Sequence, residues 1–281
     1  MVSLAGRRFV SEYLQSAYEI SERRSCRVIN LNRATKRNPP TKNQDRLLRE
    51  EIHRLSERFP RFGYRKIHDK LKESRWVVGR EQVRLIRKQE GLQVIKKQKK
   101  KRLLGKSTVQ LSKAKYPNHV WSYDIVSDQT ACGKRFRCLT VIDEYTRYGL
   151  TIHAGRSITS GHIKRVLQEL FVEWGTPTCI KSDNGPEFIA KEIQRWLNNE
   201  GIKIRYIDPG SPWQNGHNES FNGVFRDGCL DRWLFYSVQE AKRIINTWLE
   251  EYNTERPHGA LAGISPASYI KQLKGKERKA A

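Results

Sequence analysis

The order of strands and helices expected between residues 120 and 228 most constrains the fold of this 281-residue chain. Five segments are rich in aromatic and β-branched residues and are expected to be strands: 120–126, 136–142, 148–153, 178–182 and 202–207. A helix is expected after each of the third, fourth and fifth strands, because apolar residues recur there at helical spacing. These helices are expected over 160–174, over 191–199 and around Glu219. Short turns between the first three strands predict an antiparallel meander. The whole order predicts an α/β fold, a mixed sheet with helices on its faces.

The first 40 residues are expected to form short helices. One is expected over 10–18, a second from the N-cap Ser21 to Val28, and a third from Asn32 to Arg37. A short helix, a turn and a short basic helix are the pattern of a helix-turn-helix. A solvated basic pair of helices fits the same pattern equally well.

A second helical region extends to residue 97. Apolar residues at helical spacing predict a helix that ends at Pro60, and another helix is expected over 81–90. The face of this last helix opposite its apolar residues is expected to carry four cations: Arg80, Arg84, Arg87 and Lys88. Such a face suits contact with DNA phosphates or insertion into a DNA groove. A face that only meets solvent is the alternative.

Positive charge is concentrated in this helical part. Residues 1–120 hold 32 Lys and Arg against 11 Asp and Glu, whereas residues 121–281 hold 22 against 19. Such asymmetry indicates a polyanionic partner, with nucleic acid as the first candidate and an anionic membrane surface as the second. Residues 96–115 lack periodicity and are interpreted as a basic linker, in which Lys96 and Lys97 neutralise phosphates. No membrane-spanning helix is expected, because no run of about 18 apolar residues occurs.

Three acidic residues lie where the expected strand order brings chain segments together. Asp124 lies within the first strand, Asp183 directly follows the fourth, and Glu219 comes after 35 intervening residues, near the start of a helix. Carboxylates at strand ends face the crevice where open α/β sheets bind ligands. Mg²⁺ prefers oxygen ligands, and two such ions about 4 Å apart can act on both oxygens of a phosphodiester displacement. The three residues therefore predict a two-metal Mg²⁺ site, with Mn²⁺ as a substitute.

The helix that contains Glu219 is expected to carry a polar stripe. Asn215, Glu219, Asn222 and Arg226 recur at helical spacing, opposite an apolar face. Arg226 is expected to meet a DNA phosphate near the metal ions, with Asn222 beside it on the DNA-binding surface. Taken alone, this stripe fits an ordinary solvated face better. Among the other acids Asp143 is the main rival for the site, although a turn role within DEYTR is favoured.

Several of these motifs together resemble a known family. WSYDIVSD, VIDEYTR, KSDNGPEF and NGHNESFNG resemble the catalytic core of bacterial insertion-sequence DDE transposases. More narrowly, they resemble the downstream-frame (orfB) products of two-frame elements related to retroviral integrases. RFGYRKIHDKL resembles the helix-turn-helix region of these proteins, and YNTERPHGALAGISPASY resembles their C-terminal signature. The resemblance implies a ribonuclease-H-like core with three catalytic, metal-binding residues: Asp124, Asp183 and Glu219. It also implies that Arg226 is the basic residue that follows the glutamate.

The resemblance divides the chain into five expected parts. They are a short helical segment, a helix-turn-helix-like DNA-binding region, a basic linker, a catalytic core and a C-terminal helical extension with a basic tail. Their expected bounds are, in this order, 1–40, 41–97, 98–115, 116–228 and 229–281.

The function that the resemblance implies is metal-dependent DNA cleavage followed by strand transfer at insertion-sequence ends. The expected partners are double-stranded DNA, as terminal repeats and as target, further copies of the chain on that DNA, and the upstream-frame product. The expected location is the bacterial cytoplasm, in association with the nucleoid. One alternative is a catalytically inactive DNA-binding repressor derived from a transposase, which the complete set of carboxylates argues against. Another is a nuclease that acts on hybrids, which leaves the C-terminal motif unexplained.

The charge distribution predicts a strong dependence of DNA binding on salt. The logarithm of the affinity for end DNA should fall with the logarithm of salt concentration, with a slope of about −0.9 per neutralised phosphate. Deletion of residues 1–97 should flatten this slope, because the deletion removes most of the excess positive charge. Titration of a fluorescent end duplex at several salt concentrations measures both slopes. An unchanged slope would contradict a DNA-binding role for the deleted region.

Overall fold

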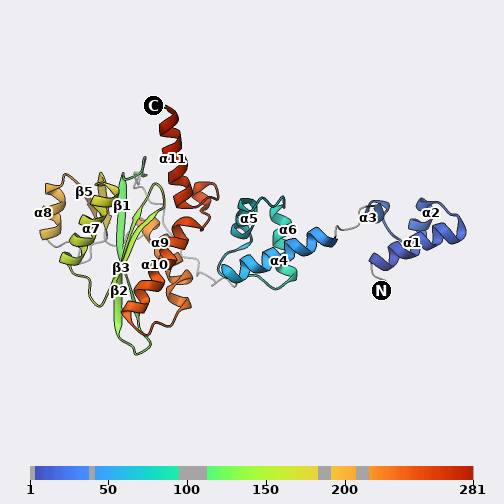
Figure 1. Ribbon diagram of the computed structural model, residues 1–281, viewed down its shortest axis with the longest axis horizontal. Helices are drawn as coiled ribbons and strands as arrows, with labels where there is room; N and C mark the ends of the chain where they lie inside the picture. The colour runs from blue at the N-terminus through green and yellow to red at the C-terminus, as the bar shows by residue number, and fades with distance from the viewer. Residues whose placement is uncertain (1–3, 38–41, 95–112, 183–190, 207–214, 281) are drawn as a thin grey trace, which may run out of the picture. The chain divides into compact units, whose positions relative to one another are not determined.

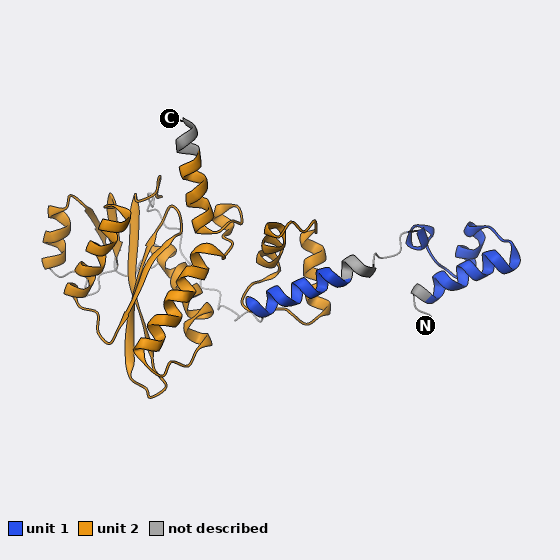
Figure 2. Cartoon of the chain, viewed as in Figure 1, with its two compact units in different colours: residues 1–58 blue, residues 59–281 orange. Residues whose placement is uncertain are grey.

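The chain forms two compact units, residues 1–58 and residues 59–281 (Figure 2). The computed structural model describes residues 4–37, 42–94, 113–182, 191–206 and 215–280. Across these ranges, no helix combines the length and the apolar character needed to cross a membrane.

The described part of the first unit is helical. Its helices are α1 (Leu4–Tyr18), α2 (Glu22–Val28), α3 (Arg33–Arg37) and α4 (Lys42–Arg58). The predicted N-cap Ser21 is confirmed, since its Oγ accepts a hydrogen bond from the Arg24 amide at 3.3 Å. Asn32, where the third helix was expected to begin, accepts a hydrogen bond from the Ala34 amide through Oδ1 at 2.9 Å. The buried hydroxyls of Ser11 and Ser25 lie 2.9 Å apart and link α1 to α2.

The second unit begins with a pair of helices, α5 (Tyr64–Glu73) and α6 (Arg80–Gln89). They pack through residues that are at most 4 % exposed: Ile67 and Leu71 of α5, Val83 and Ile86 of α6. The predicted cationic face of α6 is wrong at Arg87, which is 3 % exposed because it follows Val83 by one helical turn. Its Nη2 donates to the Leu92 carbonyl at 2.5 Å, just beyond the end of α6.

The other three cations of α6 remain accessible. Arg80 and Lys88 are exposed, and the half-buried Arg84 pairs with Glu81 one turn earlier at 2.5 Å. Leu85, which was expected on the apolar face, is 44 % exposed. The exposed side of α6 therefore holds fewer free cations than the sequence suggested.

A five-stranded mixed sheet forms the centre of the second unit, as predicted. Its strands are β1 (Val120–Gln129), β2 (Arg135–Asp143), β3 (Gly149–Gly155), β4 (Cys179–Ser182) and β5 (Lys203–Tyr206), in the spatial order β3-β2-β1-β4-β5. The pairs β1–β2 and β2–β3 are antiparallel, whereas β1–β4 and β4–β5 are parallel. The helices are α7 (Ser160–Trp174), α8 (Lys191–Asn199), α9 (Gly216–Gly228), α10 (Val238–Thr254) and α11 (Pro266–Ala280), with short 3-10 helices at Leu230–Arg232 and Gly259–Leu261.

Helices cover both faces of this sheet (Figure 1). On one face, Trp121 and Tyr123 of β1 belong to a core cluster completed by α7 and α8. On the other face, Val126 belongs to a cluster that includes Phe221 and Phe225 of α9 and residues of α10. Because side chains alternate along a strand, Ser122 and Asp124 share the face of Val126. Asp124 therefore faces α9, the helix that carries Glu219.

Close packing at Gly149 predicts a stability effect. A Cβ at this position would lie 2.6 Å from Leu249 Cδ1 and 3.1 Å from Phe221 Cε2. Gly149→Ala should lower the free energy of unfolding by about 1–3 kcal/mol, as overpacking does. In the control Gly161→Ala, the nearest atom is Thr159 Oγ1 at 3.8 Å, so stability should be unchanged or slightly higher. Urea denaturation measures both variants, and an equal effect of the two would contradict the packing argument.

Candidate catalytic site

A cleft of about 1270 Å³ is lined by residues of β1 and α9. The contribution of β1 includes Asp124, and that of α9 includes Glu219, Asn222 and Arg226. Arg61 and Val94, from the segments that flank the helix pair α5–α6, also line it. The structure thus brings four of the candidate site residues to one cleft.

Three other candidate site residues lie outside the described part of the chain. They are Asp183, Lys96 and Lys97.

The Asp124 carboxylate is held from two sides. Asn222 Nδ2 donates to Asp124 Oδ2 at 2.7 Å, and the Ile125 amide donates to Oδ1 at 2.7 Å. Thr140, the partner of Asp124 in the antiparallel register, has its Oγ1 3.0 Å from Asn222 Oδ1. Since the Asn222 amide bonds a strand residue at each end, its orientation is fixed, and so is that of the carboxylate.

Sequence reasoning missed Thr140 and the buried Asn218, whose Oδ1 lies 3.3 Å from Thr140 Oγ1. Two signals were available. Thr140 interrupts the apolar strand FRCLTVI on the same face as Asp124, and Asn218 precedes Asn222 by one helical turn.

Arg226 is anchored at the wall of the cleft. Its Nη2 donates to the Ser127 carbonyl at 2.7 Å, and its Nη1 lies 3.7 Å from Asp231 Oδ1. The predicted polar stripe is wrong at Asn215, which is 5 % exposed. Asn215 is the N-cap and comes before the first helical residue, Gly216, so it does not share the exposed face of Glu219.

A buried charge network lies where β2, β4 and α9 approach one another. Glu144, with a side chain 2 % exposed, pairs with Lys181 of β4 at 2.5 Å. His217, in the first turn of α9, has Nε2 4.0 Å from Glu144 Oε2, and its Nδ1 accepts a hydrogen bond from Arg147. Burial, with the adjacent Arg147 cation, lowers the pKa of His217, so the imidazole is neutral and accepts this bond. The network ties the end of β4 to the start of α9.

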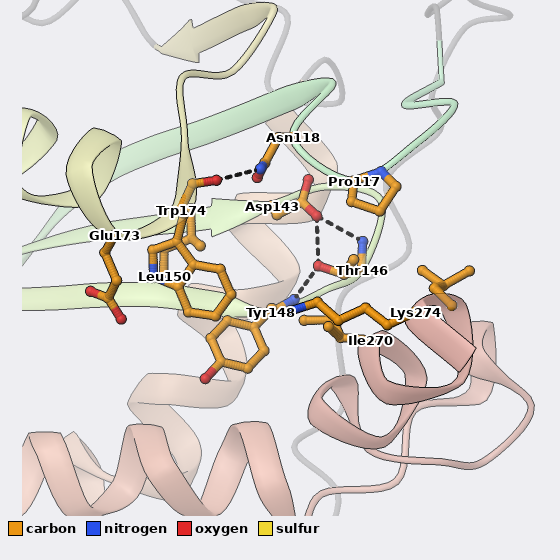
Figure 3. Close-up of a pocket in the computed structure, with 11 residues that line it drawn as sticks. Pro117, Asn118, Asp143, Thr146, Tyr148, Leu150, Glu173, Trp174, Ile270 and Lys274 are labelled. Carbon is orange, nitrogen blue, oxygen red and sulfur yellow. Dashed lines mark hydrogen bonds between the residues drawn. The ribbon is translucent and has the colours of Figure 1, made fainter. Parts of the chain in front are cut away.

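The rival carboxylate Asp143 has the turn role that was favoured from sequence. Asp143 Oδ2 accepts hydrogen bonds from the Thr146 hydroxyl at 2.6 Å and the Thr146 amide at 3.2 Å (Figure 3). Burial raises the pKa of Asp143. Its pocket, of about 430 Å³, is separate from the cleft, because the described lining residues of the two have no member in common.

The donor atoms of the cleft suit a hard cation. Asp124 and Glu219 supply carboxylate oxygens, and neither His nor Cys occurs among its described lining residues. Oxygen-only sites favour Mg²⁺ or Mn²⁺ over Zn²⁺. Within the described residues no group of three His, Cys, Asp or Glu is placed to hold a metal ion. The cleft also carries Asp227 and Asp231, but these two carboxylates pair with Arg61 and Arg226.

Three families of domains match consecutive parts of the chain. An HTH-like domain matches residues 42–100, and two integrase core domain families match residues 114–212 and 200–266. These matches cover both the helix pair α5–α6 and the sheet with its site.

Two relatives match most of the chain. The uncharacterized 39.2 kDa protein of insertion element IS476 from Xanthomonas euvesicatoria is 36% identical over 251 residues, which are 89% of this chain and 72% of the relative. The uncharacterized 31.7 kDa protein of insertion element IS407 from Burkholderia multivorans is 31% identical over 257 residues, which are 91% of this chain and 92% of the relative. Among solved structures, the HTLV-2 integrase catalytic core domain in complex with magnesium has a TM-score of 0.43 and 20% identity, covering 53% of this chain and 93% of that one.

The buried Glu144–Lys181 pair predicts a charge-dependent loss of stability. Lys181→Met leaves a buried carboxylate unpaired and should lower the free energy of unfolding by about 3–5 kcal/mol. Adding Glu144→Gln should recover part of this loss, because no unpaired charge remains. Lys164→Met, which breaks the more exposed pair with Glu192, should cost less than about 1 kcal/mol. Urea denaturation compares the variants, and no recovery in the double variant would show that the charge is not the cause.

Proposed function

Because the chain belongs to the integrase-core transposases of bacterial insertion elements, we propose that it cleaves DNA at the ends of such an element and joins the cut strand to target DNA. The observation that carries the proposal is the cleft shared by Asp124 and Glu219, in which Asn222 holds Asp124. Two carboxylates from a central strand and a covering helix provide oxygen ligands beside a space large enough for a DNA strand.

Asp183 is the proposed third carboxylate. In the parallel pairing of β1 with β4, Ser122 is the partner of Lys181. Asp124 and Asp183 each follow two residues after these partners, and Asp183 comes directly after the last residue of β4, Ser182. The register therefore supports an assignment that the sequence motif suggested.

The three carboxylates are proposed to hold Mg²⁺, with Mn²⁺ as a substitute. When bound in a pair, such ions activate the attacking water or DNA 3′-hydroxyl and stabilise the leaving oxygen. The protein contributes orientation, because Asn222 fixes the Asp124 carboxylate against the sheet. Without a cation, Asp124 and Glu219 repel a phosphate group by like charge. The cation is therefore expected to strengthen the binding of DNA in the cleft, while DNA still binds without it.

DNA binding is proposed to involve both the helix pair and the cleft. In the HTH-like region, Arg80 and Lys88 are exposed on α6, and Lys96 and Lys97 follow it. Arg226 has donors beyond the one used on Ser127, and these are proposed to contact a phosphate beside the carboxylates. Further copies of the chain on DNA, and the product of an upstream frame, are the proposed protein partners.

Substitution of the carboxylates tests the proposed function. Glu219→Gln and Asp183→Asn should each reduce Mg²⁺-dependent cleavage and joining of an end duplex by at least about 1000-fold, since each removes a charged metal ligand. Glu192→Gln, which changes an exposed carboxylate of α8 outside the cleft, is the control and should retain activity. Products are followed on denaturing gels with Mg²⁺, Mn²⁺ or EDTA.

Each outcome of this experiment separates the alternatives. Near wild-type rates in both carboxylate variants would show that the site is wrongly assigned. A wild-type chain that binds end DNA but forms no metal-dependent product would favour a repressor. Preferential cleavage of RNA–DNA hybrids would favour a nuclease of the ribonuclease H class.

A further inference from the structure

Large apolar side chains are exposed together just after α9. Trp233, Leu234 and Tyr236 are 53%, 64% and 73% exposed, whereas Phe235 between them is 1% exposed. Residues 233–236 are here named the aromatic loop. Contiguous exposed apolar side chains of this size mark a binding surface more often than a plain solvent-facing loop.

The aromatic loop is firmly anchored. The Phe235 ring packs edge-on against Phe136 of β2 at 5.7 Å, and the Phe235 carbonyl accepts a hydrogen bond from the Ala131 amide at 2.7 Å. On the far side, the Tyr236 amide donates to Glu240 Oε2 at 2.7 Å, and Ser237 caps α10. Because the backbone is held at both ends, the exposed rings can bind a partner at a small cost in conformational entropy.

Cations surround the aromatic loop. Arg232 precedes it, and Lys134 and Arg135 lie at the β1–β2 turn to which Ala131 ties it. All three are exposed, and none forms an ion pair with an acidic residue in the part of the chain that the structure describes. Arg156 Nη1 lies 3.3 Å from both the Lys134 and the Arg135 carbonyls and steadies the turn. The nearby Glu240 carboxylate is engaged by the Tyr236 amide.

The aromatic loop adjoins the cleft. Asp231, two residues before Trp233, lines the cleft and lies 3.7 Å from Arg226. Along the other wall, β1 continues from Asp124 and Ser127, which line the cleft, toward the β1–β2 turn (Figure 1). A strand of DNA that leaves the carboxylates along β1 would therefore reach the aromatic rings.

We propose that the aromatic loop and its three cations bind unpaired bases of the DNA strand next to the point of cleavage. Aromatic faces stack on bases that are already unstacked, and nearby Lys and Arg neutralise their phosphates. An intact duplex offers no free base faces, and an apolar protein partner gains little from the cations. The chemistry therefore selects single-stranded DNA that flanks a duplex end. This inference rests on the proposed function, because it needs DNA in the cleft.

Binding of full-length protein to two fluorescent DNAs in EDTA tests the inference. One is a blunt end duplex and the other carries a single-stranded overhang of several nucleotides. The wild-type protein should bind the DNA with the overhang more tightly than the blunt duplex. The double variant Trp233→Ala/Tyr236→Ala should bind the overhang DNA about 10- to 100-fold more weakly and the blunt duplex with unchanged affinity. Trp233→Phe should retain most of the preference. Val172→Ala, at an 89% exposed site on α7, is the control and should change neither affinity.

The native cysteines allow a second measurement. Cys132, in the β1–β2 turn, is the one exposed thiol of the five. Its hydrogen bond with the Thr130 hydroxyl lowers the pKa of Cys132, which favours thiol–disulfide exchange. A disulfide tether on the overhang should cross-link to Cys132 in wild type and much less in Trp233→Ala. The same tether at the far end of the duplex should give little product.

The outcomes distinguish this inference from the proposed function. Glu219→Gln should lose cleavage yet keep the overhang preference, since no metal is needed for stacking. Equal affinity of wild type for blunt and overhanging DNA, or equal cross-linking from both tether positions, would overturn the inference. A change of oligomeric state in the double alanine variant, measured by light scattering, with unaltered DNA binding would instead assign the loop to contact between copies of the chain.

Discussion

The hydrogen bond from Asn222 to Asp124 joins α9 to the central strand, and the arrangement of the site depends on it. A half-buried carboxylate on a sheet face loses part of its hydration, which costs free energy unless hydrogen bonds replace it. Asn222 and the Ile125 amide supply that replacement. The same helix buries Phe221 and Phe225 against the sheet, so apolar packing fixes the distance at which the polar contact forms. Stability and site geometry thus come from one helix–sheet contact.

A second polar contact fixes the neighbouring elements. Glu144 and Lys181 form a buried pair, and Arg147 binds His217 beside it. Replacing such a pair with apolar residues is often neutral for stability, so burial of charge alone does not explain it. The pair and the adjacent Arg147–His217 bond instead fix positions, because together they link the last residues of β4 with the first turn of α9. In sequence, Asp183 follows the first of these segments and Glu219 lies in the second.

Sequence patterns within one segment predicted the helices and strands well, but they did not predict the contacts between them. Helix α7 has the predicted bounds because Thr159 caps it and Gly175 ends it. Arg87 and Asn215 were misplaced, since a helical stripe read from sequence does not show which side a neighbouring helix covers or where the first turn begins. The bond between Thr140 and Asn222 joins residues 82 apart in sequence. Such a contact depends on strand order, which periodicity within one element does not contain.

Strand β1 shows how one element serves core, site and surface. Its odd-numbered residues Trp121 and Tyr123 fill one core, and its even-numbered residues place Asp124 beneath α9. The strand was expected to end at residue 126, yet it continues to Gln129, because Asp128 and Gln129 pair with Phe136 and Arg135. This extension carries the β1–β2 turn beyond the cleft, and Phe136 supplies the surface on which Phe235 packs. The carboxylate and the aromatic loop are therefore held in register by one continuous strand pair, so displacement of β1 would move both together.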